Sequence, residues 1–174
     1  MNDSLKTLYE RRSIRKYKEK QISNEELELV LKAGVCAPTA MNMQSPIIIA
    51  VQNREEIAYL SMLNARIMGK EGTDPFYGAP TVLIVLADAA NKNAVKDGSL
   101  VMGNLMNAAH AIGLGSCWIN RATELFEMDE GKALLDKWGI IGEYIGIGNC
   151  ILGYPDQEKP AMKPRKENYV YYVR

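Results

Sequence analysis

The sequence predicts an α+β fold in which helices cover both faces of a β-sheet, giving a three-layer α/β/α sandwich. Apolar runs at 47–51, 81–87 and 144–152 are continuous instead of alternating with polar residues, which is typical of strands buried on both faces. Segments with helical periodicity separate these runs, so helices are available to cover the sheet. No linker, repeat or low-complexity tract interrupts the 174 residues, and we expect a single domain spanning 1–174.

The helices are predicted from their N-terminal caps and their apolar spacing. Residues 3–10 form a short first helix. Ser23, followed by Glu26 three residues later, makes a capping box, and the apolar residues behind it recur at helical spacing, which predicts a helix over 24–35. Three more helices are expected at 54–66, which Asn53 caps, at 94–112 and at 124–138.

Strands are expected at the three apolar runs and at 116–119. The polar segment 69–78 contains several glycines and is predicted to be an exposed loop. Residues 169–173 have strand propensity, but they follow a stretch that three prolines interrupt. We therefore expect this tail to reach away from its own core.

The charge balance argues against nucleic-acid and membrane partners. Lys plus Arg and Asp plus Glu each number 21, so the net charge is zero and no global field attracts the chain to polyanions. The longest apolar runs are far too short to span a bilayer. The start, Met1 to Ser4, lacks the apolar core of a signal peptide, so a cytoplasmic protein is expected.

The cysteine and histidine content points away from disulfides and metals. Cys36, Cys117 and Cys150 are an odd number, widely spaced in apolar sequence, and we expect them to be reduced and buried. His110 is the only histidine, which excludes a multi-histidine metal site. Its alanine-rich neighbourhood predicts a packed core residue.

Two basic clusters are candidates for binding a phosphate. Arg11, Arg12 and Arg15 place three guanidinium groups within five residues, with the Ser13 hydroxyl between them. Guanidinium forks bind phosphate oxygens bidentately, and a hydroxyl adds a further donor. A second cluster, Lys163 to Lys166, lies near the other end of the chain. The alternative is that each cluster is only a solvated charged patch.

The segment 37–46 has the composition of a surface that a flat heterocycle can approach. Its small residues allow close backbone contact, and Asn42 and Gln44 offer both donors and acceptors. Such amides fit the pyrimidine edge of a flavin, although an ordinary helix-to-strand loop is the alternative. The glycine-containing stretches 113–118 and 146–151 both fail the GxGxxG pattern, so no Rossmann fingerprint is present.

Taken together, four short motifs resemble those of the nitroreductase family. They are Arg11-Arg12-Ser13-x-Arg15, Pro38-Thr39-Ala40-x-Asn42-x-Gln44, the run from Gly113 to Ile119, and Lys163-Pro164-Arg165. Each motif is weak alone, but they follow the family's order and span 11–165, nearly the whole chain.

The resemblance implies three groups of cofactor-binding residues. The FMN phosphate and ribityl chain would be held by Arg11, Arg12, Ser13 and Arg15, with the clamp completed by Lys163 and Arg165. The flavin would be reached, in part from a second subunit, by Pro38, Thr39, Ala40, Asn42 and Gln44. The isoalloxazine ring would lie along Trp118, Ile119 and Asn120, with a backbone N–H at Asn120 directed at N5.

The resemblance also implies an architecture and an activity. The family forms intertwined homodimers with a mixed sheet and with FMN at the interface, and the tail 167–174 would reach the partner subunit. The chain would pass hydride from NAD(P)H through FMN to an electron-poor acceptor, such as a nitroaromatic or a quinone, with ping-pong kinetics. Because the flavin carries the chemistry, no catalytic side chain and no metal are expected.

Two departures and two alternatives accompany this hypothesis. Ser45-Pro46 stands where the family often has Pro-Trp, and the short segment 64–79 leaves the substrate face open or covered only by a loop. A non-catalytic flavin-binding or redox-sensing protein would bind FMN with slow or absent turnover. A nucleic-acid-binding module would use 11–20 as a basic arm, but the zero net charge opposes it.

Overall fold

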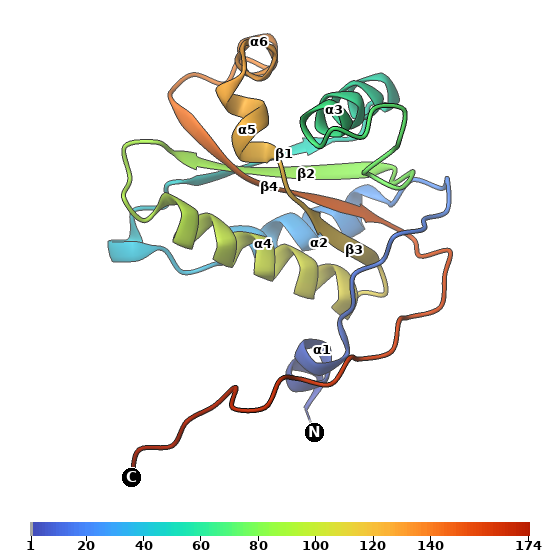
Figure 1. Ribbon diagram of the computed structural model, residues 1–174, viewed down its shortest axis with the longest axis vertical. Coiled ribbons are helices and arrows are strands. Elements are labelled where there is room, and N and C mark those ends of the chain that lie inside the picture. Colours follow the sequence, from blue (N-terminus) through green and yellow to red (C-terminus); the bar gives the residue numbers. More distant parts are fainter. Residues whose placement is uncertain (1) are drawn as a thin grey trace.

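A four-stranded antiparallel sheet forms the middle layer of the molecule, as Figure 1 shows. The computed structural model describes residues 2–174; Met1, the first residue of the expected domain, lies outside them. The strand order across the sheet is β1 (Pro46–Val51), β2 (Thr81–Asp88), β4 (Tyr144–Gly153) and β3 (Gly115–Ile119). The two longest strands are therefore central, and β1 and β3 form the edges.

Helices cover both faces of this sheet, so the predicted three-layer arrangement is confirmed (Figure 1). One face carries α3 (Arg54–Ile67), α5 (Ala122–Glu127) and α6 (Asp129–Lys137), and the other carries α2 (Asn24–Val35) and α4 (Ala94–Ala111). Alternate residues of β2 enter the two cores: Ile84 packs with the α3 side and Val85 with the α4 side. This double burial explains why the strand reads as a continuous apolar run.

Local capping signals correctly predict where α2 and α3 begin. The Ser23 hydroxyl and the Glu26 carboxylate form the reciprocal capping box of α2. The Asn53 side chain accepts hydrogen bonds from the backbone N–H groups of Glu55 and Glu56 at the start of α3, both at 3.0 Å. The short helix α1 (Asp3–Glu10) forms as expected and lies outside the three layers, below the end of α4 (Figure 1).

Several predictions about longer segments need correction. The helix expected over 124–138 is two helices, because Met128 adopts an extended conformation (φ −77°, ψ 157°). The sheet was predicted to be mixed, but its neighbouring strands are antiparallel. Parallel pairing occurs at an isolated bridge between Ser13 and Ser116. The loop over 69–78 is not wholly exposed, since the Phe76 side chain is 1% exposed and belongs to the core. The tail 169–173 needs no correction: it is exposed throughout and extends away from its own core, as expected (Figure 1).

Gly146 is required where α5 begins on the surface of β4. A Cβ atom at this position would lie 2.0 Å from the Ala122 carbonyl oxygen, which is backbone and cannot rotate away. The same N-terminus is fixed by the Thr123 hydroxyl, which donates to the Gly146 carbonyl oxygen at 2.6 Å. Close approach of two backbones thus explains a glycine inside a buried strand.

Gly146→Ala is expected to destabilise the fold by about 1–3 kcal/mol, because the added methyl group forces α5 away from β4. Urea unfolding followed by circular dichroism measures the change in the free energy of unfolding. Gly103→Ala is the matched control: a Cβ atom added there, on α4, would have nothing within 4 Å, so a gain of up to about 1 kcal/mol in helix stability is expected. Equal stabilities for the two variants would contradict this account of the α5–β4 contact.

Among residues 2–174, no helix combines the length and the apolar character that crossing a membrane requires. The same part of the chain contains no group of three or more His, Cys, Asp and Glu side chains placed to hold a metal ion.

Candidate functional site

The N-terminal basic segment lies along the outer edge of β3. The backbone N–H of Ile14 donates to the Ser116 carbonyl oxygen at 3.0 Å, and Ser13 forms the parallel bridge with Ser116. The Ile14 side chain is buried against Gly115, where an added Cβ atom would lie 3.0 Å from it. Two of the four predicted motifs are therefore brought together by backbone pairing.

Two guanidinium nitrogens in this segment are buried and have no hydrogen-bond partner in the part of the chain that the structure describes. They are Nη1 of Arg11 and Nε of Arg12. Nη1 of Arg12 is used locally, since it donates to the carbonyl oxygens of Tyr9 at 2.8 Å and of Arg11 at 2.7 Å. A buried charged donor without an acceptor is costly. The donor set therefore fits an anionic oxygen ligand such as a phosphate.

Arg15 is placed differently from the other two arginines. Its residue is exposed, and its backbone N–H donates to Oε1 of Gln157 at 2.9 Å. Tyr17 pairs with Pro155 two residues further on. The segment 13–17 is thus held between β3 and the start of the C-terminal tail, which fixes the path of the basic run.

The side chains of the predicted β3 motif are largely committed to the two cores. Trp118 packs on the α4 side and Ile119 on the α3 side. Nε1 of Trp118 and Oγ of Ser116 are nevertheless buried without partners. Asn120, directly after the strand, is exposed. A ligand that lies along this strand would therefore contact the backbone of β3 and the C-terminal end of β3 more than these side chains.

Two buried asparagines that sequence reasoning missed hold the end of β3. Nδ2 of Asn64 on α3 donates to the Asn120 carbonyl oxygen at 3.0 Å, and Nδ2 of Asn149 on β4 lies 3.5 Å from the Ile119 carbonyl oxygen. Both residues are 0% exposed, and neither Oδ1 atom has a hydrogen-bond donor within 2–174. An amide inside an apolar helix or strand is the sequence signal that could have identified them.

Arg121 follows the β3 motif in a left-handed conformation, with φ 81°. A non-glycine residue seldom adopts this backbone, and such residues often occur at functional sites. The side chain is held by Glu124, whose Oε1 is 2.7 Å from Nη1. This ion pair lowers the pKa of the Glu124 carboxyl. Arg121 thereby ends β3 sharply and starts α5.

The second predicted motif forms a tight turn before β1, at the other end of the molecule (Figure 1). Met41, Asn42 and Gln44 all have positive φ angles, of 52°, 55° and 51°. The Gln44 N–H donates to Oγ1 of Thr39 at 3.0 Å, and Nε2 of Gln44 lies 3.4 Å from Oδ1 of Asn42. The side-chain amides of Asn42 and Gln44, which are predicted to form hydrogen bonds with the edge of a flavin, are thus adjacent and exposed.

Within one chain this turn does not meet the basic segment. The turn is bonded to the first part of α4 through Asp97, whereas the basic segment lies beside Gly115, just after α4 ends. α4 has 18 residues, and at 1.5 Å per residue such a helix is roughly 27 Å long. The two halves of the predicted site therefore lie at opposite ends of α4 (Figure 1).

The C-terminal cluster also stays apart from the arginines. The tail runs past α1, where Nζ of Lys159 is 3.1 Å from Oε2 of Glu10, and continues away from the body (Figure 1). Lys163 and Arg165 are exposed on this extended segment. Within residues 2–174, no hydrogen bond or ion pair joins them to the basic segment. Completion of the phosphate clamp by these two residues stays a prediction.

The single histidine and one cysteine are less buried than expected. His110 is half-buried in the last turn of α4. Burial and then Lys159 lower its pKa, Glu10 opposes them, and Arg11 and Arg12 act in the same direction as Lys159. Cys36 is exposed at the end of α2, and Cys117 and Cys150 are buried as predicted. Burial raises the pKa of the Cys150 thiol to about 12, so it stays protonated.

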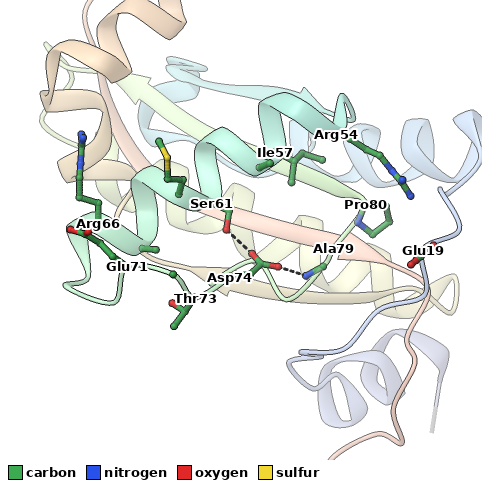
Figure 2. Close-up of a pocket in the computed structure, with 15 residues that line it drawn as sticks. Glu19, Arg54, Ile57, Ser61, Arg66, Glu71, Thr73, Asp74, Ala79 and Pro80 are labelled. Atoms are coloured by element: carbon green, nitrogen blue, oxygen red, sulfur yellow. Dashed lines mark hydrogen bonds between the residues drawn. The ribbon is translucent and has the colours of Figure 1, made fainter.

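Two cavities differ in their relation to the predicted site. One of about 650 Å³ has the turn as one wall, including Ala40 and Gln44. Another, of about 830 Å³ (Figure 2), lies between α3 and residues 71–80 and contains none of the predicted residues. Its loop is held by Asp74, which accepts hydrogen bonds from the Ser61 hydroxyl at 2.6 Å and the Gly78 N–H at 2.6 Å.

Comparisons with known proteins agree on one family. The family model described as Nitroreductase family matches residues 8–147. A protein of Archaeoglobus fulgidus, provisionally named an NADH dehydrogenase/NAD(P)H nitroreductase, is 34% identical over 165 residues, which cover 91% of this chain and 89% of the relative. The FMN reductase [NAD(P)H] of Bacillus subtilis is 27% identical over 192 residues, covering 95% of this chain and 70% of the relative.

A solved structure is similar along its whole length. The nitroreductase with bound FMN from Bacteroides fragilis superimposes with a TM-score of 0.92, at 28% identity and with 100% of each chain covered. The similarity thus includes both ends of α4 and the tail, where the separated motifs lie.

Proposed function

Because this chain belongs to the nitroreductase family, we propose that it is an FMN-dependent oxidoreductase that passes hydride from NAD(P)H to an electron-poor acceptor. The main observation behind this proposal is that Arg11 and Arg12, beside the β3 motif, each have a buried guanidinium nitrogen without a hydrogen-bond partner in the described chain. The bound FMN of the structural relative and the NAD(P)H-dependent names of the sequence relatives support it. Bound FMN would supply the capacity to accept and donate hydride.

The chain's own residues would bind and orient the cofactor. Arg11, Arg12 and Ser13 would hold the phosphate, with Arg15 on the same segment and with Lys163 and Arg165 approaching from the tail. Arginine suits this role because its rigid fork matches two phosphate oxygens at once. The ring would lie beside the backbone at the end of β3, with an N–H at Asn120. The buried amides of Asn64 and Asn149 fix that strand end.

No side chain is required as a general base, because hydride transfer removes no proton from NAD(P)H, and the proton that the reduced acceptor takes up would come from solvent at the open face. The residues would instead align donor and acceptor in turn on one face, which predicts ping-pong kinetics. We expect acceptors such as nitroaromatics or quinones, since a single exposed face accommodates flat electron-poor rings. Donor and acceptor would not be bound together.

We propose that the active form is a homodimer with FMN at the interface. The phosphate-binding residues and the Pro38–Gln44 turn lie at opposite ends of α4, so one chain cannot present both to the same cofactor. A second copy in the opposite orientation could bring its turn to the first copy's basic segment. The three free cysteines further favour a reducing compartment, the cytoplasm, as the place of action.

An absorption spectrum of the purified protein, before and after anaerobic addition of NADH or NADPH, tests this function. A flavin spectrum that bleaches on addition is the expected result. Bound flavin that does not bleach would favour the flavin-binding or redox-sensing alternative. A colourless protein that FMN does not reconstitute would refute the proposal, and salt-dependent binding to DNA or RNA would then be measured for the basic arm.

A further inference from the structure

The turn from Thr39 to Gln44 holds three left-handed residues within four positions. Met41, Asn42 and Gln44 have φ angles between 51° and 55°. Outside glycine this conformation is unfavourable, and it persists only where the surroundings impose it. A flexible turn would therefore relax, and the two amides would lose their fixed arrangement.

Side-chain packing does not impose this conformation. Met41 is 93% exposed and Met43 is 64% exposed. Bonds inside the turn close it on itself: the Gln44 N–H donates to the Thr39 hydroxyl at 3.0 Å, and the Met43 N–H donates to the Ala40 carbonyl oxygen at 3.0 Å. These bonds shape the turn, but they do not attach it to the rest of the molecule.

Asp97 supplies the attachment. Its side chain lies in the first turn of α4, it is 3% exposed, and Oδ1 accepts the backbone N–H of Ala40 at 3.1 Å. In the described part of the chain, this is the hydrogen bond by which residues 39–44 reach another element. Oδ2 is buried and finds no hydrogen-bond donor among the described residues. Burying a carboxylate is costly, so a carboxylate in this position points to a specific role.

We propose that Asp97 is a positioning residue for flavin binding, which ties the strained turn to α4 and so presents Asn42 and Gln44 in a fixed orientation. This inference rests on the proposed function and extends it to a residue outside all four cofactor motifs. Because the turn is already ordered before the flavin binds, the free energy of binding is not reduced by the entropy of ordering it. Asp97 itself need not touch the cofactor.

Titration of the flavin-free protein with FMN, followed by quenching of FMN fluorescence, tests this role. Asp97→Ala is expected to weaken FMN binding by about 10- to 100-fold, the range for losing a hydrogen bond to a charged group. Asp97→Asn keeps an oxygen acceptor for Ala40 and should restore affinity to within about threefold of the wild type. Asp97→Leu fills the same space without an acceptor, and it replaces the alanine variant if that variant does not fold.

Two further measurements separate positioning from general destabilisation. Leu134→Ala empties a buried site on α6, far from the turn, and should lower the melting temperature without changing FMN affinity well below it. Hydrogen exchange at the Ala40 amide should accelerate in Asp97→Ala and not in Leu134→Ala. Riboflavin, which lacks the phosphate, should lose affinity by the same factor as FMN in Asp97→Ala, since under the proposed function the turn would contact the ring.

The outcomes are distinguishable. If the folded Asp97→Ala or Asp97→Leu variant, with wild-type sedimentation, binds FMN as tightly as the wild type, the positioning role is wrong. It is also wrong if Asp97→Asn is as weak as Asp97→Ala. A wild-type protein that binds no FMN would instead refute the proposed function, and the positioning role of Asp97 would be refuted with it.

Discussion

Arg11→Ala is expected to release FMN, with a dissociation constant about 10- to 100-fold higher than that of the wild type. Nη1 of Arg11 is buried and has no hydrogen-bond partner among residues 2–174, so the acceptor we expect for it is the ligand. Combining this change with Arg15→Ala should yield protein that purifies without flavin. Absorbance of the purified variants and fluorescence titration with FMN measure the effect. Arg11→Lys should be intermediate, because an ammonium keeps the charge but loses the fork.

The control for this prediction is Lys16→Ala in the same segment. Lys16 is a surface residue, and its Nζ is 2.9 Å from Oδ2 of Asp156, so its removal changes the net charge equally without touching the buried donors. FMN affinity should stay at the wild-type value. Riboflavin binding should be unaffected by Arg11→Ala, because riboflavin has no phosphate. A double Arg11/Arg15 variant with its full flavin content would show that the phosphate site has been misassigned.

Deletion of residues 167–174 is expected to convert the proposed dimer into monomers at concentrations where the full chain would be dimeric. Residues 169–173 are all large and apolar or aromatic, and they are between 62% and 100% exposed. β1 lies at a sheet edge, and three consecutive isoleucines in it are only half-buried. An exposed apolar edge strand needs a cover. The tail of a second copy has the strand propensity to supply one.

The expected magnitude follows from the burial of five side chains. Full burial contributes about 1.5–3 kcal/mol for each large apolar side chain, and ordering the chain cancels about 1–2 kcal/mol per residue. The difference is a few kcal/mol, and a loss of about 3 kcal/mol weakens the dimer by about 100-fold. Sedimentation velocity over a range of protein concentrations measures this shift.

Removal of Arg174 alone is the matched control for the deletion, and it should leave the dimer intact. The deletion retains Lys163 and Arg165, so any loss of FMN would follow from loss of the partner's turn and not from loss of basic residues. A truncated protein that sediments as a dimer over the same concentrations as the full chain would contradict a tail that embraces the partner.

Local signals along the chain were sufficient to predict the starts of the first four helices, the strands and the layers. Ser23 and Asn53 cap their helices through atoms two or three residues away, so the signal is local and can be read from spacing. The continuous apolar run of β2 likewise indicates that both faces are covered, because a strand presents alternate residues to each face. The four motifs, read in order, were enough to indicate the family.

The placement of those motifs depends on packing between distant elements. The break at Met128, the burial of Phe76 and the exposure of Cys36 depend on which elements pack together, which spacing does not encode. Asn64 and Asn149 acquire their role only because α3 and β4 meet the end of β3. The length of α4 separates the basic segment from the Thr39–Gln44 turn, because a rigid helix keeps its two ends apart. That separation, together with the anchor at Asp97, is a long-range property that no local pattern contains.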